Sequence, residues 1–347
     1  MNTKKILALV LSLLLVVALF GACSDEQSTP SEEPSAAAPT EKPSEAPPAD
    51  DDEPSEAPNA GGKKTIAFCI ANADDQWLSY MYDAAREFAD QNPDYDYVWG
   101  DGKNDLAEQL SIVENWVMQG VDAMVINPYD SESTGPIVDM CNENDIVVVA
   151  VNRTFPNQDQ ATSVCTGDNK QAGLLEARYI AEQLEEGDPV AVFRGQDNHE
   201  SSQERVAGFE EICEEFGLEI IFNQTGNYFR DEGLKLAEDL IQSGQEFKAI
   251  FSANDEMAIG AYMACDAAGL EGIMIGGIDA TPDALQYLNE GSMYVCTVFQ
   301  DAKGQAWGGL QAAVDALEGK DVEAEIYIDF ELVVAADRDK YLEIWGL

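Results

Sequence analysis

Short apolar runs alternate with longer amphipathic stretches from residue 63 to the C-terminus, and this alternation constrains the fold most strongly. The longer stretches have helical spacing, with Leu78, Met81, Ala85 and Phe88 on one face. Most short runs are apolar at nearly every position, as is typical of strands covered on both faces. Strands that alternate with helices indicate parallel sheets built from strand–helix units. The predicted strands are 65–71, 95–99, 123–127, 146–151, 190–194, 219–222, 249–252, 273–278 and 294–299.

The pattern restarts near residue 168, which indicates two sheets instead of one. A long helical stretch, 171–185, follows the sequence Gly167-Asp168-Asn169. After Gln300 only a helix (301–317) and a strand (326–334) remain, too little for a third domain. We therefore predict an α/β protein with two doubly wound parallel-sheet lobes, joined by several crossovers that act as a hinge. The first lobe is expected to comprise residues 63–167 and 300–331, and the second 168–299 and 332–347.

The N-terminus has the pattern of an export signal. Lys4 and Lys5 precede an apolar run (6–20), and small residues lead to Cys23. We expect residues 1–22 to be a lipoprotein signal peptide, with Cys23 the acylated N-terminus that anchors the protein to the outer face of the cell membrane. An ordinary secretory signal with an incidental cysteine is the alternative. The rest of 23–62 is rich in Pro, Ser, Glu and Asp, and we expect a disordered linker there.

Charge and composition exclude several classes of function. The 347 residues include 66 acidic and 19 basic side chains, a net charge of -47 that opposes nucleic-acid binding. The single histidine excludes a metal site with two histidines and acid–base chemistry by a histidine pair. We expect no cofactor.

The cysteines after Cys23 are far apart in the sequence, and their spacing does not select any disulfide pairing. Several lie inside apolar runs, where free cysteine behaves as a small buried hydrophobe. We therefore favour free thiols for Cys69, Cys141, Cys165, Cys213, Cys265 and Cys296.

Polar and aromatic side chains follow most of the apolar runs. Ligands of open parallel sheets bind beyond the carboxyl ends of the strands, so these side chains are expected to meet. Asp, Asn and Arg can each hold adjacent hydroxyl groups, and a flat aromatic ring covers the C–H face of a sugar. The set therefore suits a neutral polyol. Asn and Asp at these positions can instead be helix N-caps, but capping does not require Trp77, Arg153 or Arg205.

Several stretches are similar to those of one known family. They are ADDQW (73–77), GVDAMVINP (120–128), VNRT (151–154), GQDNHESSQER (195–205), ANDEMAIGA (253–261), GIDATPDAL (277–285) and TVFQDAKGQA (297–306). On these stretches the chain resembles the periplasmic sugar-binding proteins of ABC importers, of the type I fold, and most closely their galactose/glucose-binding branch.

The resemblance implies a set of ligand-binding residues. In the family an aromatic ring stacks on the sugar, and here Phe229 is expected to do so, with Tyr228 as its rival. Ser201 stands where the family has an acidic residue. The calcium loop of the galactose/glucose-binding branch is missing, so we expect no structural metal. The implied set is Asp75, Trp77, Asn152, Arg153, His199, Arg205, Phe229, Asn254, Asp279 and Gln300.

The resemblance also implies a function. We expect an extracytoplasmic, monomeric lipoprotein that captures a monosaccharide, with a galactose- or glucose-type hexose favoured, and delivers it to the transmembrane subunits of an ABC permease. The same fold can serve a sensor that docks on a chemoreceptor or a histidine kinase. An enzyme is disfavoured, because His199 has no nucleophile to pair with.

Overall fold

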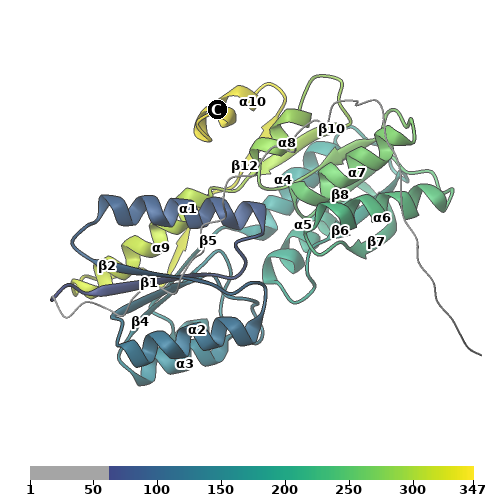
Figure 1. Cartoon of the computed structure of the whole chain (residues 1–347). Coiled ribbons are helices and arrows are strands. Elements are labelled where there is room, and N and C mark those ends of the chain that lie inside the picture. The colour runs from purple at the N-terminus through teal and green to yellow at the C-terminus, as the bar shows by residue number, and fades with distance from the viewer. Residues whose placement is uncertain (1–61) are drawn as a thin grey trace, which may run out of the picture. The chain divides into compact units, whose positions relative to one another are not determined.

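The computed structural model describes residues 62–347, and in them two six-stranded sheets form the two predicted α/β lobes (Figure 1). Every strand pair of the first sheet is parallel. In the second sheet only β12 runs antiparallel to its neighbour β10. The first sheet has the order β2 (Asp96–Asp101), β1 (Thr65–Ile70), β3 (Ala123–Ile126), β4 (Val147–Val151), β5 (Ser163–Thr166) and β11 (Glu325–Tyr327). The second has β7 (Glu219–Thr225), β6 (Pro189–Arg194), β8 (Ala249–Ser252), β9 (Met274–Gly276), β10 (Tyr294–Phe299) and β12 (Glu331–Val334).

Helices cover both faces of each sheet, which explains why the strands are apolar on both sides. On the first sheet, α1 (Gln76–Gln91) and α9 (Ala302–Leu317) pack on one face, and α2 (Leu106–Gln119) and α3 (Gly135–Glu143) on the other (Figure 1). On the second sheet, α4 (Asn169–Ala181) and α5 (Glu200–Phe216) lie opposite α6 (Arg230–Gln242), α7 (Asp255–Ala267) and α8 (Pro282–Tyr287). Short helices η1 (Gln158–Gln160) and α10 (Arg338–Ile344) complete the fold.

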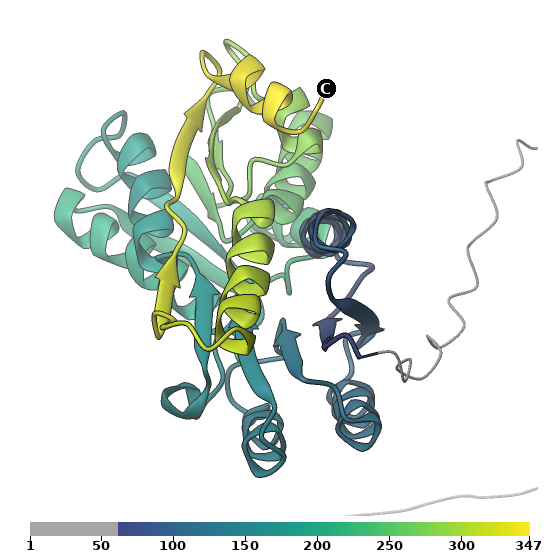
Figure 2. The ribbon, with the colours of Figure 1, turned by 90° about the vertical axis from the view of Figure 1, so that its left-hand side faces the viewer.

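The segment predicted as one strand over 326–334 forms two strands in different sheets. β11 pairs with β5 of the first sheet, and β12 pairs with β10 of the second. Figure 2 shows this C-terminal segment, in yellow, passing from one lobe to the other. Between the strands, Phe330 is buried in the second lobe against Gly167, where a Cβ would collide with its ring. The prediction was wrong because an apolar pattern does not indicate which sheet a residue pairs with.

Two further elements were not predicted. β5 has four residues with polar Ser163 and Thr166 at its ends, too few for a hydrophobic pattern, yet all four are buried. The Ser163 hydroxyl donates to the Glu323 carbonyl at 2.8 Å, and the Thr166 hydroxyl donates to the Asn152 carbonyl at 2.7 Å. The other element is α10, which follows β12 and packs near α8.

The six cysteines of the described region are free and buried, as the sequence favoured. Burial raises the pKa of the Cys69, Cys141, Cys165 and Cys213 thiols to about 12. The predicted signal peptide, Cys23 and almost all of the linker lie outside the described residues. Over 62–347, no helix combines the length and apolar character needed to cross a membrane.

An ionisable side chain lies in the core of the second lobe. Glu176 of α4 is fully buried, and its Oε1 accepts a hydrogen bond from the Ser252 backbone N–H at 3.0 Å. Its Oε2 has no hydrogen-bond partner among the described residues. Burial raises the pKa of Glu176 well above its usual range, the Asp255 carboxylate raises it further, and Arg205 opposes both. The folded protein therefore holds a proton on Glu176 that the unfolded chain releases above its ordinary pKa.

This proton makes the free energy of unfolding depend on pH. Because the folded-state pKa is raised, Glu176 contributes stability below pH 4.5, and the contribution is lost as pH rises toward the raised pKa. We expect Glu176→Gln to match the parent protein in free energy of unfolding near pH 4 and to be more stable at pH 7. The gap between the two free energies should grow by up to about 1.4 kcal/mol per pH unit across this window. Chemical denaturation at a series of pH values measures the gap. Exposed Glu182→Gln is the control and should not change the pH profile; a constant gap for Glu176→Gln would contradict the prediction.

Candidate functional site

A cleft between the lobes lies at the carboxyl ends of the parallel strands, where the sequence predicted a ligand site. It encloses about 350 Å³ of empty space, part of it open to solvent, within the size range of small-molecule sites. All predicted ligand residues except His199 and Phe229 line it. The lining residues are Asp75, Trp77, Leu78, Asn152, Arg153, Ser201, Arg205, Tyr228, Asn254, Asp279 and Gln300.

The first lobe contributes an acid and an aromatic ring from the start of α1. Asp75 is the N-cap of this helix, and its Oδ1 accepts from the Leu78 backbone N–H at 2.9 Å. Capping does not remove Asp75 from the site, since this residue also lines the cleft. The Trp77 indole N–H donates to the Gln300 carbonyl at 3.2 Å, which fixes the ring against the crossover between the lobes.

Asn152 and Arg153 enter the cleft from the end of β4. Asn152 has a left-handed φ of 66°, and its amide N–H donates to Gln305 Oε1 at 3.3 Å. Arg153 Nη1 donates to the carbonyls of Pro128 and Tyr129 at 3.0 and 3.1 Å. Burial lowers the pKa of Arg153 from its ordinary value. The guanidinium is thus held in one orientation by the backbone of its own lobe.

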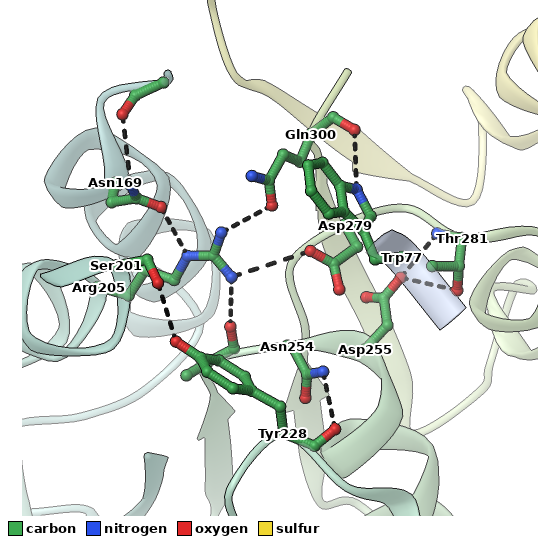
Figure 3. A network of polar contacts seen from close by, with 12 residues as sticks. Trp77, Asn169, Ser201, Arg205, Tyr228, Asn254, Asp255, Asp279, Thr281 and Gln300 are labelled. Atoms are coloured by element: carbon green, nitrogen blue, oxygen red, sulfur yellow. Dashed lines mark hydrogen bonds and ion pairs between the residues drawn. The ribbon is translucent and has the colours of Figure 1, made fainter. Parts of the chain in front are cut away.

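Arg205 of α5 is the centre of a polar network in the second lobe (Figure 3). Its Nε donates to Asn169 Oδ1 at 3.0 Å, and its Nη1 donates to the Ala253 carbonyl at 2.7 Å. Nη2 donates to Gln300 Oε1 at 2.7 Å, and Nη1 lies 3.8 Å from the Asp279 carboxylate. The buried charge therefore has several fixed partners, and it orients Gln300 and Asp279 toward the cleft.

Asp279 and Asp75 give the cleft two acceptor groups. Burial raises the pKa of both carboxyl groups, strongly for Asp279, where Arg205 opposes the rise. Two acidic and two guanidinium side chains give the lining both acceptors and donors, which suits an uncharged ligand with many hydroxyl groups. Across residues 62–347, no group of three or more His, Cys, Asp or Glu side chains is arranged to hold a metal ion.

Asn254 and Asp255 divide the roles of ligand residue and support. Asn254 lines the cleft, caps α7 by accepting from the Met257 N–H at 3.1 Å, and donates to the Tyr228 carbonyl at 3.1 Å. Asp255 lies behind it and is fully buried. The Asp255 carboxylate accepts hydrogen bonds from the Thr281 N–H and from the hydroxyls of Thr281, Thr297 and Tyr294, at 2.6–3.1 Å. It therefore ties α7 to the segment that follows Asp279.

Of the two rival aromatic residues, the structure places Tyr228 at the cleft and not Phe229, which the predicted set contained. Tyr228 lines the cleft, and its hydroxyl lies 3.0 Å from the Ser201 hydroxyl (Figure 3). Gly195 leaves room for its ring, since a Cβ there would be 2.6 Å from the tyrosine oxygen. Phe229 is the N-cap of α6 and is 40% exposed. The backbone explains why Tyr228 and not Phe229 reaches the cleft. Asn227 and Tyr228 have left-handed φ values of 54° and 71°, and this turn was not predicted from the sequence.

His199 does not line the cleft, in contrast to the prediction. It is fully buried at the N-cap of α5, and its ring stacks on Tyr228 with centroids 5.8 Å apart. Neither imidazole nitrogen makes a hydrogen bond within the described residues. Burial and the Arg153 charge lower the pKa of His199 to about 2, so the ring is neutral. The structure thus places this histidine behind Tyr228, where it supports the aromatic ring.

Two lining residues were absent from the prediction besides Tyr228. Ser201 was seen in the sequence only as the replacement for an acidic residue, yet its hydroxyl orients Tyr228. Leu78 is an ordinary apolar residue on the buried face of α1, and no sequence signal distinguishes it.

The sequence and the fold have counterparts among known proteins. The family described as periplasmic binding protein domain matches residues 66–321. A putative rhizopine-binding protein of Rhizobium meliloti is 33% identical over 288 residues, covering 80% of this chain and 92% of its own. The ribose import binding protein of Escherichia coli (strain K12) is 30% identical over 276 residues, with the same shares covered.

Among solved structures, an ABC transporter solute binding protein from Bacillus halodurans C-125 with bound myo-inositol has a TM-score of 0.77 and 40% identity to this chain. The match covers 81% of this chain and 97% of that protein.

The contrast between Tyr228 and Phe229 can be tested with a sugar that the parent protein binds. Tyr228→Ala should weaken binding about 30-fold, because an aromatic face that is covered by the ligand is lost, at a cost of roughly 2 kcal/mol. Phe229→Ala is the matched control and should stay within about twofold, since Phe229 does not line the cleft. Isothermal titration calorimetry measures both; a larger loss for Phe229→Ala than for Tyr228→Ala would reverse the assignment.

Proposed function

The chain belongs to the periplasmic binding protein family, and from this premise we propose that it is the extracytoplasmic receptor of an ABC importer for a cyclic polyol or sugar. Members of this family are solute-binding proteins, so the chain binds a solute and is not an enzyme. The observation that carries the proposal is the set of fixed carboxyl, guanidinium and amide groups, with Trp77 and Tyr228, in one cleft between the lobes. Such a set recognises hydroxyl groups and ring faces together.

For the ligand itself we favour myo-inositol. The related structure with 40% identity holds this compound, and a ring of six hydroxyl-bearing carbons offers a hydroxyl in every direction to the lining residues. Ser201 also supports it, because the acidic residue that the resemblance implies there, near an anomeric hydroxyl, is missing. A galactose- or glucose-type hexose, as the resemblance suggested, and ribose, from the name of one relative, are the competing ligands.

Capture works by closure of the lobes. We take residues 63–167 and 300–331 as the first lobe and 168–299 and 332–347 as the second. Asn198 of the second lobe donates to Asp130 of the first at 3.1 Å, and the Thr154 hydroxyl donates to Glu200. A ligand held by Asp75 on one side and by residues such as Asp279 on the other binds the closed form better than the open one, and so drives closure.

Delivery requires a membrane partner. The closed protein would dock on the transmembrane subunits of the permease, with the acylated Cys23 and the acidic linker keeping the monomeric receptor at the outer face of the membrane. A sensor that presents the same closed form to a chemoreceptor or a histidine kinase is the second candidate. A transport assay in cells that carry or lack the permease subunits separates the two.

Ligand binding should raise the melting temperature by mass action. At a hundredfold excess over its dissociation constant, myo-inositol should stabilise the folded protein by about 2.7 kcal/mol. Differential scanning fluorimetry with myo-inositol, D-galactose, D-glucose and D-ribose at equal concentrations ranks the four. If none of them shifts the melting temperature, the proposed ligand class is wrong.

Asp279 should contribute strongly to affinity. Asp279→Ala removes an acceptor for ligand hydroxyls and the carboxyl group that lies 3.8 Å from the buried Arg205, a loss of about 2–4 kcal/mol in binding free energy. The exposed Asp266→Ala on α7 is the control and should bind normally. Calorimetry with the ligand ranked first measures the loss, and a thermal scan confirms that the variant is folded. Unchanged affinity would remove Asp279 from the site.

A further inference from the structure

Trp345, near the C-terminus, contacts both lobes. It follows α10, which is anchored in the second lobe by Tyr341, a side chain only 2% exposed whose hydroxyl donates to Glu331 at 2.7 Å. The Trp345 ring lies against Tyr80 on α1 of the first lobe, with centroids 4.6 Å apart. It packs against the main hydrophobic clusters of both lobes. A residue of the C-terminal tail therefore crosses the gap that ligand capture must close.

The same indole holds the loop that carries Asp279. Its N–H donates to the Ala280 carbonyl at 2.8 Å, while the Ala280 N–H donates to the Thr297 hydroxyl at 3.1 Å. Asp279 and Ala280 have positive φ values of 130° and 51°, conformations that persist only where neighbouring groups hold the backbone. β10 holds this loop from one side and Trp345 from the other.

Tyr80 is directed at the second lobe. The Gln76 amide donates to its hydroxyl at 3.2 Å. Burial raises the pKa of Tyr80, and the carboxylates of Asp283 and Glu256, both in the second lobe, raise it further. The ring that Trp345 contacts therefore belongs to the surface at which the two lobes meet.

We propose that Trp345 is a positioning residue for ligand capture, which holds the Asp279 loop in its binding conformation and latches the second lobe to Tyr80 when the lobes close. This inference rests on the proposed function, capture of a polyol by closure. A contact made only in the closed form increases the population of that form, so it tightens apparent binding and slows ligand release.

The test compares variants on the two sides of the latch, with myo-inositol as the probe. Trp345→Ala and Tyr80→Ala should each weaken binding about tenfold, mainly through faster release, because the open form already admits the ligand. The double variant should lose clearly less affinity than the product of the two single losses, because both substitutions remove the same contact. Tyr80→Phe keeps the ring and should restore nearly parental binding. Trp345→Phe keeps a ring but loses the bond to Ala280, so it should fall between the parent and Trp345→Ala.

Trp307→Phe is the matched control. The Trp307 indole also donates to an alanine carbonyl, that of Ala84 at 2.9 Å, but all of its packing lies within the first lobe. This variant should lower the melting temperature while leaving affinity and release rate within about twofold of the parent. Calorimetry, stopped-flow release and thermal scans of the ligand-free variants give the readouts.

The outcomes separate this inference from the function beneath it. If the parent protein binds none of myo-inositol, D-galactose, D-glucose or D-ribose, the proposed function fails and the latch fails with it. If the parent binds and folded Trp345→Ala stays within twofold of it, only the latch is overturned. The latch would also be overturned if the losses of affinity in Trp345→Ala and Tyr80→Ala multiplied in the double variant. It would likewise be overturned if Trp307→Phe released the ligand as fast as Trp345→Ala.

Discussion

The buried guanidinium of Arg205 is the interaction on which the site depends. A charge removed from water must be matched by fixed partners, and here they come from four segments that are distant in the sequence: Asn169, Ala253, Asp279 and Gln300. Satisfying this one side chain brings together the start of α4, the end of β8, the loop after β9 and the crossover after β10. Most polar contacts of the second lobe with a ligand follow from that arrangement.

The first lobe contributes through the same crossover. The Trp77 indole bonds to the carbonyl of Gln300, whose side chain bonds to Arg205, so one residue links the lobes through its backbone and its side chain. The polar groups of the cleft are therefore held by bonds within the protein itself. Donors and acceptors fixed in this way lose little entropy on binding, which favours affinity.

Much of the fold was predictable, because parallel sheets covered on both faces leave a strong pattern of apolar runs. The positions of most residues that line the cleft were predictable for a related reason: polar residues after such runs must converge at one edge. The failures have physical causes. Phe229 and Tyr228 are adjacent aromatics, and the left-handed backbone at Asn227 and Tyr228 selects between them. His199 has the sequence position of a ligand residue, but the ring of Tyr228 stacks on it and occupies the space on the cleft side. Gly195, which has no side chain, leaves room for that ring.

The sequence alone predicted the two-lobed α/β architecture and a site lined by polar and aromatic side chains, since these depend on periodicity and on residue types at strand ends; the class of protein followed from stretches that resemble one family. Tertiary structure decided which aromatic ring lines the cleft, that the segment over 325–334 divides between two sheets, and that Trp345 reaches Tyr80. Those outcomes depend on pairing partners, backbone angles at single residues and contacts between segments far apart in the chain. Local sequence does not determine them, because each depends on packing against another part of the molecule.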